Sequence, residues 1–215
     1  GGGGGSPPQM CSVPTTPSNP GAPAGNECVG NPSNVTGGNK FQREVDFNAL
    51  PGVLGLELVR YYNSDYSRYL SGEGPSKRAL GRGWRTNYDT DLDTHSGKQS
   101  GEIHFFSADG KKFTYRNSAK APLVFSSGRQ GDASRIERSG TGAAERFTLR
   151  QGDGTRFVFD ANGWMLETHA PSGEVLRVQR DAQSRLQKVT DPQGRELVFH
   201  YVGDEGKAPG SGSAK

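Results

Sequence analysis

Near the carboxyl end of the chain, Asp191, Arg195 and His200 have side chains that could act together in acid–base chemistry, within the stretch RLQKVTDPQGRELVFHY. A carboxylate beside a histidine could exchange a proton, while a neighbouring arginine keeps the carboxylate ionised. Asp191 is, however, followed by Pro192 and Gly194, a pattern typical of a turn whose aspartate accepts hydrogen bonds from backbone N–H groups. Whether these residues do chemistry or form a turn depends on whether the pattern recurs along the chain.

The pattern does recur, because four segments share a turn glycine that is followed by apolar residues three and five positions later. The glycine supplies the positive φ of a tight turn, and residues two positions apart in a strand point to the same sheet face. The segments are GKKFTY from Gly110, GTRFVF from Gly154, GEVLRV from Gly173 and GRELVF from Gly194. The pairs expected to share a face are Phe113/Tyr115, Phe157/Phe159, Leu176/Val178 and Leu197/Phe199.

A longer match joins the last two copies. Residues 160–173 (DANGWMLETHAPSG) align without a gap on residues 181–194 (DAQSRLQKVTDPQG), which gives a period near 21 residues. Each copy contains two short strands and two turns and cannot bury its apolar face alone, so the repeat indicates a stacked β array. Ala170 takes the place of Asp191 in the earlier copy, which argues against a catalytic aspartate repeated along the array. We therefore interpret Asp191 and Arg195 as turn and pairing residues.

The first half of the chain also has the apolar alternation of half-buried strands. Residues 41–47 (FQREVDF) and 54–59 (LGLELV) alternate with period two on either side of a Pro51-Gly52 turn. We expect a loop over residues 63–83, and strand character resumes at residues 84–92 (WRTNYDTDL). No amphipathic helix is evident. The predicted fold is all-β, with antiparallel strands and hairpins in a curved sheet.

Composition limits the kinds of partner. The 26 basic and 23 acidic residues are interspersed and leave a formal net charge of +3, so we expect no nucleic-acid binding. No stretch approaches the roughly 20 apolar residues that cross a bilayer, so we expect no membrane insertion. The 32 glycines suit a protein with many tight turns and few helices.

No set of residues has the spacing of a catalytic, metal or cofactor site. The chain lacks a Gly-x-Ser-x-Gly nucleophile elbow, a phosphate-binding loop and a zinc-ligand spacing. We therefore expect no catalytic residue, no metal and no cofactor, and structural or solvated roles for the histidines. The histidines are His95, His104, His169 and His200.

Residues 1–38 and 206–215 are expected to be flexible, the first as a Pro/Gly-rich leader and the second as a Gly/Ser-rich tail. Cys11 and Cys28 are the only cysteines and both lie in the leader. Two cysteines in such a segment indicate a disulfide formed in an oxidising compartment, with two free thiols or an intermolecular bond as the alternatives.

The repeats FDANGWMLETHAPSG and RDAQSRLQKVTDPQGRELVFHY resemble the Tyr-Asp (YD) repeats of bacterial RHS proteins, whose unit reads Tyr-Asp-x-x-Gly-Arg-Leu…Asp-x-x-Gly-Arg. The Tyr-Asp pair is degenerate here, as Phe159-Asp160, Arg180-Asp181 and, near the end, Tyr201-Val202. In the first half, the stretches GNPSNVTGGNKFQREVDF, LGLELVRYYNS and LGRGWRTNYDTDL resemble the module that precedes YD repeats in many RHS shells. The resemblance covers about residues 30–202 and implies an N-terminal RHS-type β module at 39–100 and a YD-repeat array at 101–205.

The resemblance implies a structural function. RHS proteins are long secreted polypeptides whose YD repeats wind into a hollow β shell, and in polymorphic toxins that shell encloses a C-terminal toxin during delivery between competing cells. We therefore expect a non-catalytic scaffold section, secreted or extracellular in a bacterium, with the periplasm as the alternative. Its expected partners are the remainder of an RHS shell or toxin polypeptide, or another copy bound through open sheet edges. The chain lacks a match to the self-cleaving RHS core and to a toxin, so we expect a fragment, a truncated gene product or a processed piece.

A second hypothesis is a free-standing secreted module that binds carbohydrate or a cell-surface partner through aromatic side chains. Tyrosines and a tryptophan crowd residues 61–88, where core packing is the simpler interpretation. Trp164 stands where the aligned repeat has Arg185, so Trp164 is the best candidate for an exposed or inter-domain contact with a partner.

Overall fold

The computed structural model describes residues 40–64, 83–94 and 101–201. Within these ranges the regular structure consists of strands and one turn of 3-10 helix, Gly142–Ala144. The all-β prediction is therefore confirmed. In chain order the strands are β1 (Phe41–Phe47), β2 (Leu58–Asn63), β3 (Trp84–Thr86), β4 (Asp91–Asp93), β5 (Glu102–Phe106), β6 (Lys112–Ser118), β7 (Ala121–Ser126), β8 (Arg135–Ser139), β9 (Arg146–Arg150), β10 (Arg156–Phe159), β11 (Met165–His169), β12 (Val175–Arg180), β13 (Leu186–Thr190) and β14 (Glu196–Val198).

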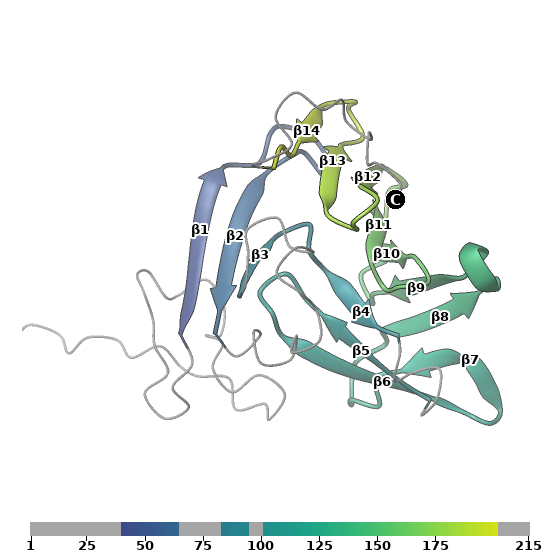
Figure 1. The fold of residues 1–215 in the computed structure, drawn as a ribbon. Coiled ribbons are helices and arrows are strands. Elements are labelled where there is room, and N and C mark those ends of the chain that lie inside the picture. Colours follow the sequence, from purple (N-terminus) through teal and green to yellow (C-terminus); the bar gives the residue numbers. More distant parts are fainter. Residues whose placement is uncertain (1–39, 65–82, 95–100, 202–215) are drawn as a thin grey trace, which may run out of the picture.

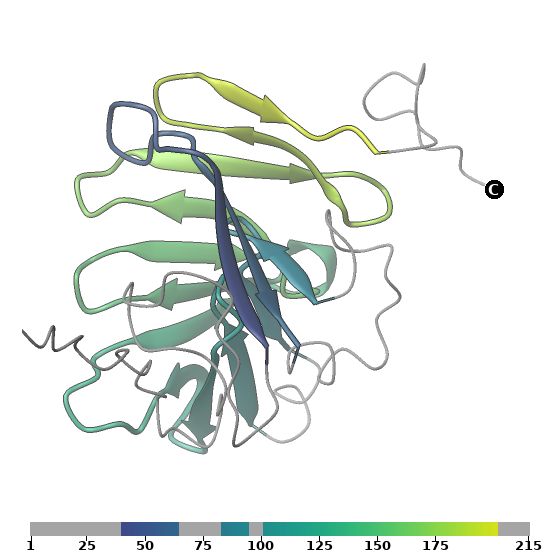
Figure 2. The same cartoon turned by 90° about the vertical axis from the view of Figure 1, so that its left-hand side faces the viewer.

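The strands form two antiparallel sheets (Figure 1). The small sheet has the order β1-β2-β3, and the large sheet contains the 11 strands from β4 to β14 in sequence order. Each strand of the large sheet therefore pairs with its neighbours in the chain, as expected for a succession of hairpins. The segment between β3 and β4 carries the chain from one sheet to the other, and in Figure 2 β1 and β2 cross over the strands of the large sheet.

The repeat alignment corresponds to equivalent strands. β11 and β13 have the same order of buried and half-buried residues along their length. Each follows a strand whose register shifts just before the turn, at Val158/Phe159 in one repeat and at Gln179/Arg180 in the next. The four repeat glycines all have positive φ, between 84° and 104°. All eight apolar residues of the glycine segments lie within one hydrophobic core or pack against it.

The large sheet curls around this core. Phe105 of β5 lies 6.3 Å from Phe157 and 6.2 Å from Phe159 of β10, measured between ring centroids. These strands are far apart in the order of the sheet, so the rings can meet only because the sheet bends back on itself. Leu56 and Tyr88, from the segments that border β2 and β3, belong to the same core.

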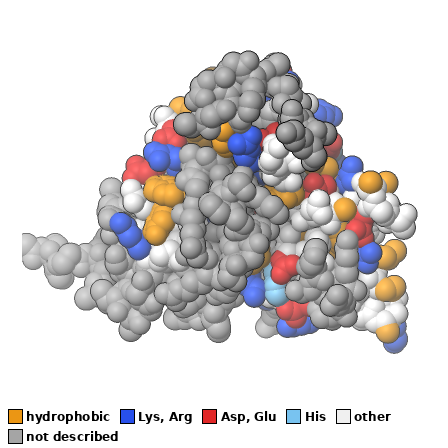
Figure 3. Space-filling model, in the orientation of Figure 1, with side chains coloured by type: hydrophobic (Ala, Val, Ile, Leu, Met, Phe, Trp, Pro, Cys, Tyr) orange, Lys and Arg blue, Asp and Glu red, His pale blue; other side chains and the backbone are white. Residues whose placement is uncertain are grey.

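The surface of the described residues carries mixed charges. In Figure 3, basic and acidic side chains are interspersed, and hydrophobic side chains gather over β1 and β2. None of the described segments forms a helix long and apolar enough to span a membrane.

Candidate functional site

The last two turns of the repeat array, before β13 and before β14, are built around an aspartate and an arginine four residues apart. In one turn, the backbone N–H and Nε of Arg185 donate to Asp181 at 2.9 and 2.7 Å. In the next turn, the same groups of Arg195 donate to Asp191 at 2.9 and 2.7 Å. The aspartate thus ties the backbone and the side chain on the far side of each turn, which explains why both residue types recur at this spacing.

Asp191 is not arranged as a proton carrier. Its buried carboxylate also accepts a hydrogen bond from the N–H of Leu56 at 3.3 Å. Burial raises the pKa of Asp191, but the hydrogen bonds from the backbone and side chain of Arg195 and from Leu56 outweigh burial and hold the pKa below its usual value. His200 is exposed beyond β14, and no hydrogen bond or ion pair between described residues joins it to Asp191 or Arg195.

The Asp191 turn binds the loop that precedes β2. Arg195 Nη2 donates to the carbonyl of Pro51 at 2.6 Å, and Gln193 Nε2 donates to the carbonyl of Val53 at 3.2 Å. Together with the Leu56 contact, these bonds attach the first half of the chain to the turn between β13 and β14. The chemical groups that suggested a site in the sequence therefore join two distant segments of the fold.

A second attachment joins β4 to the turn between β10 and β11. The N–H of Leu92 donates to the carbonyl of Gly163 at 2.8 Å, and Asp91 forms an isolated antiparallel bridge with Trp164. A Cβ on Gly163 would lie 2.0 Å from the carbonyl oxygen of Leu92, so the close approach of the two backbones requires glycine.

Trp164 lies at this attachment and is only 5% exposed. Of the two settings expected for it, an exposed surface and a contact between modules, the structure shows the second. Its ring is covered by the guanidinium of Arg180, 4.6 Å from the ring centroid. The interpretation of Trp164 as a contact for an external partner such as carbohydrate is therefore wrong, because the β4 segment and Arg180 bury the ring.

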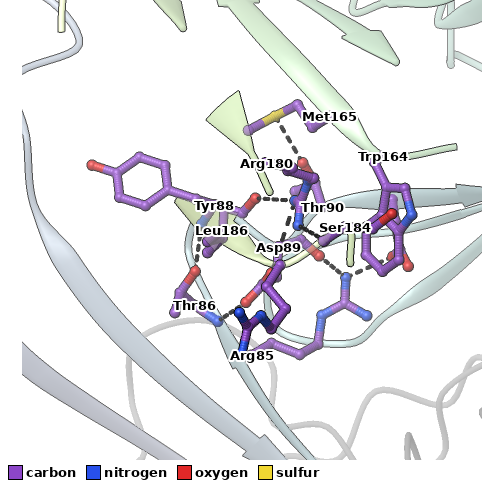
Figure 4. A network of polar contacts seen from close by, with 12 residues as sticks. Arg85, Thr86, Tyr88, Asp89, Thr90, Trp164, Met165, Arg180, Ser184 and Leu186 are labelled. Atoms are coloured by element: carbon purple, nitrogen blue, oxygen red, sulfur yellow. Dashed lines mark hydrogen bonds and ion pairs between the residues drawn. The ribbon is translucent and has the colours of Figure 1, made fainter. Parts of the chain in front are cut away.

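A buried polar network extends from Trp164 into the corner between β3 and β4 (Figure 4). Arg85 is 1% exposed, and its Nη2 donates to Asp91 Oδ1 at 2.8 Å and to the carbonyl of Asp89. The side chain of Asp89 also takes part, since its carboxylate Oδ2 accepts a hydrogen bond from the N–H of Thr86 at 2.7 Å. A buried guanidinium needs such acceptors, since an unpaired buried charge is costly.

Arg180 completes the network from the repeat array. Its Nη1 donates to the carbonyl of Ser184 at 3.1 Å, its Nη2 donates to the carbonyl of Tyr88 at 3.5 Å, and the guanidinium lies 4.0 Å from Asp89. In the repeat alignment Arg180 takes the place of the core residue Phe159. The position at which this repeat has an arginine in place of the aligned phenylalanine is thus the position at which the array contacts the corner between β3 and β4.

Tyr201, the last described residue, packs on the final repeat. Its hydroxyl donates to the carbonyl of Leu186 at 2.6 Å, and the Arg185 guanidinium lies 4.1 Å from its ring centroid. Burial raises the pKa of the Tyr201 hydroxyl, and the carboxylates of Asp89 and Asp181 raise it further.

His104 and His169 lie on strands and pair with nearby side chains. His104 Nε2 lies 2.5 Å from Glu102, and His169 Nε2 lies 2.6 Å from Glu167. Among the residues that the structure describes, no three acidic, histidine or cysteine side chains are placed to hold a metal ion. His95, the predicted disulfide of Cys11 and Cys28, and the predicted leader and tail lie outside the described residues.

Comparison with known families finds matches in two regions of the chain. Residues 30–115 match a domain of unknown function, DUF6531, which is often associated with RHS and YD-repeat proteins. Residues 159–196 match the RHS repeat, and this span contains both Asp-Arg turns. The chain is an RHS/YD-repeat protein. No curated protein matches it.

In this RHS protein, the repeat match runs from the end of β10 into β14, and the N-terminal match contains the small sheet, β4 and β5. The two attachments therefore join the N-terminal region to the RHS repeats. Sequence reasoning missed Arg85, Asp89 and Asp91 as members of the network. The only sequence feature that could have indicated them is the number of charged residues in WRTNYDTDL, a stretch that is otherwise typical of a strand.

Proposed function

We propose that this chain is a structural section of a secreted RHS shell, and that it helps to enclose or present a toxin or partner in competition between bacterial cells. The observation that carries the proposal is the sheet that grows hairpin by hairpin in sequence order. Each added repeat would extend such a sheet by two strands without changing what precedes it. Within the described residues, β14 pairs only with β13, so its outer edge could accept the next strand.

The proposed role is mechanical and the section itself makes and breaks no bond. The groups most suited to chemistry, Asp191 and Arg195, are engaged with each other and with backbone groups. The N-terminal region is attached to two turns of the repeat array. These contacts support the proposed role, because they would hold the first part of the large sheet in its curved shape. The alternative, a carbohydrate-binding module, relied on Trp164 as an exposed aromatic side chain. Trp164 is buried, so it does not support that alternative.

The test compares a producing bacterial strain with a strain from which the codons for residues 101–201 are deleted in frame. We expect the deletion to abolish growth inhibition of a susceptible neighbour and to make the associated polypeptide sensitive to added protease. Unchanged inhibition and unchanged protease resistance would contradict the proposal. So would catalytic turnover by the purified chain that disappears on Asp191→Asn.

A further inference from the structure

Three arginines form a row across adjacent strands of the large sheet. Arg135 of β8 lies opposite Arg150 of β9, and Arg150 lies opposite Arg156 of β10. We call these three residues the cationic row. Their neighbours Ile136, Leu149 and Phe157 form the matching row that faces the core, so the cationic row lies on the outer face of the sheet.

This arrangement is unfavourable for the isolated fold. Like charges placed directly opposite each other on neighbouring strands destabilise a sheet. Glu137 compensates part of the charge, since its carboxylate lies 2.9 Å from Arg135 Nε and 2.8 Å from Arg150 Nε. The pKa of Glu137 is lowered, first by the hydrogen bond from Arg150, so this carboxylate is ionised. One glutamate against three arginines leaves the row positive.

Arg156 carries the uncompensated part of this charge. Its guanidinium lies 3.3 Å from His169 Nδ1, while His169 Nε2 is bonded to Glu167. No ion pair to a carboxylate is found for Arg156 within the described segments. The side chains of Arg135 and Arg150 are 48% and 36% exposed, so a partner can reach the row.

The surroundings of the row limit the chemistry of its partner. β8, β9 and β10 are paired along both edges, so no added strand can bind there and the contact must use side chains. The next outer positions are Glu137, Thr148 and Val158. None of these residues is aromatic, so the stacking platform on which single-stranded nucleic acids and sugar rings bind is absent at this site.

We propose that the cationic row binds an acidic α-helix of a partner protein. Neighbouring strands lie about 4.8 Å apart. Carboxylates at every third or fourth position of a helix recur at a similar spacing, about 5–6 Å between Cβ atoms. Arginine suits this pairing because its planar guanidinium binds a carboxylate through two parallel hydrogen bonds. The proposal does not depend on the shell function, since it rests only on the charges of the outer face of β8, β9 and β10.

The test uses the whole chain and two fluorescein-labelled helical peptides of the same composition. One peptide carries glutamates along a single face at every fourth position, and the other distributes them around the helix. The row variant is Arg150→Gln with Arg156→Gln. The control variant is Arg116→Gln with Lys120→Gln, which removes the same charge from exposed residues of β6 and the following turn. Each variant removes one ion-paired residue, since Arg116 pairs with Glu102 at 2.7 Å.

Fluorescence anisotropy should show that the one-face peptide binds the wild-type chain more tightly than the distributed peptide does. The row variant should weaken this binding about tenfold and the control variant less than about twofold. The urea midpoint of the row variant should equal or exceed that of the wild type, because opposed like charges are removed. Equal binding of the two peptides, no peptide binding, or no loss in the row variant would overturn the proposal. Tighter binding of single-stranded oligo(dT) or dextran sulfate than of the peptide would also overturn it.

Discussion

At the scale of the residue, Gly163 and Gly194 each end a four-residue turn of the array, three residues after an aspartate. Their φ angles are +88° and +84°. A Cβ at Gly163 would lie 2.0 Å from the Leu92 carbonyl oxygen, whereas a Cβ at Gly194 would meet nothing within 4 Å. The sequence pattern predicts a turn glycine at both positions. Only the fold shows that β4 packs against Gly163 and not against Gly194.

We expect Gly163→Ala to destabilise the chain far more than Gly194→Ala. Both substitutions place a side chain at positive φ, which costs about 1–2 kcal/mol. Gly163→Ala must also displace β4, so its total cost should exceed about 3 kcal/mol. Urea unfolding of the two variants measures the difference, and equal losses would show that the contact with β4 contributes little.

Asp191 should make the stability of the chain depend on pH in the acid range. Its pKa is lowered in the folded protein, so its contribution is complete above the unfolded value of about 3.9 and is lost as the pH falls through the folded pKa. Asp191→Asn should therefore lose about 2 kcal/mol at pH 7, with the gap to wild type narrowing below about pH 4. Unfolding curves between pH 7 and pH 3 test this, and a constant gap would contradict it.

At the scale of the element, β12 serves the core and the attachment at once. Leu176 and Val178 point into the core, while Arg180, after the register shift, reaches the corner between β3 and β4. Arg180 continues the alternation of Leu176 and Val178, so its side chain also points inward, where its guanidinium lies 4.0 Å from Asp89. A period of two predicts this inward position, but it does not predict which carboxylate lies beside the arginine.

Arg180→Met should cost about 3–5 kcal/mol, because it removes one of the two guanidiniums beside the buried Asp89 and also the contact with Trp164. Arg177→Met is the matched control, since Arg177 is an exposed arginine of the same strand and should cost less than about 0.5 kcal/mol. Thermal unfolding followed by tryptophan fluorescence compares the two. Similar stabilities would mean that Arg180 is not essential to the attachment.

At the scale of the whole molecule, the curled sheet presents a backbone edge at β14. Phe199 donates its N–H to Gln187 of the strand before it, so the N–H of Val198 points to the opposite side by the alternation of a strand. This side is where the next repeat of a shell, or the edge of another copy, would pair. Val198 is also 40% exposed.

We expect the purified chain to give a β-type circular dichroism spectrum and to self-associate through this edge. Val198→Pro removes the outward donor and should reduce association in sedimentation velocity experiments while leaving the spectrum unchanged. Gly194→Ala serves as a control that leaves the edge intact. Association that Val198→Pro leaves unchanged would place the contact on another surface.

The sequence by itself determined the β class, the hairpin repeat, the apolar pairs of the core and the turn role of Asp191, because these depend on φ preferences and on alternation within a few residues. Only the tertiary structure decided that the Asp191 turn holds the loop before β2, that Trp164 is buried, and that Arg85 and Asp89 form a network. Those contacts join segments far apart in the chain, and they exist only because the large sheet curls. The curl comes from the twist and register shifts of many strands acting together, which no local pattern reports.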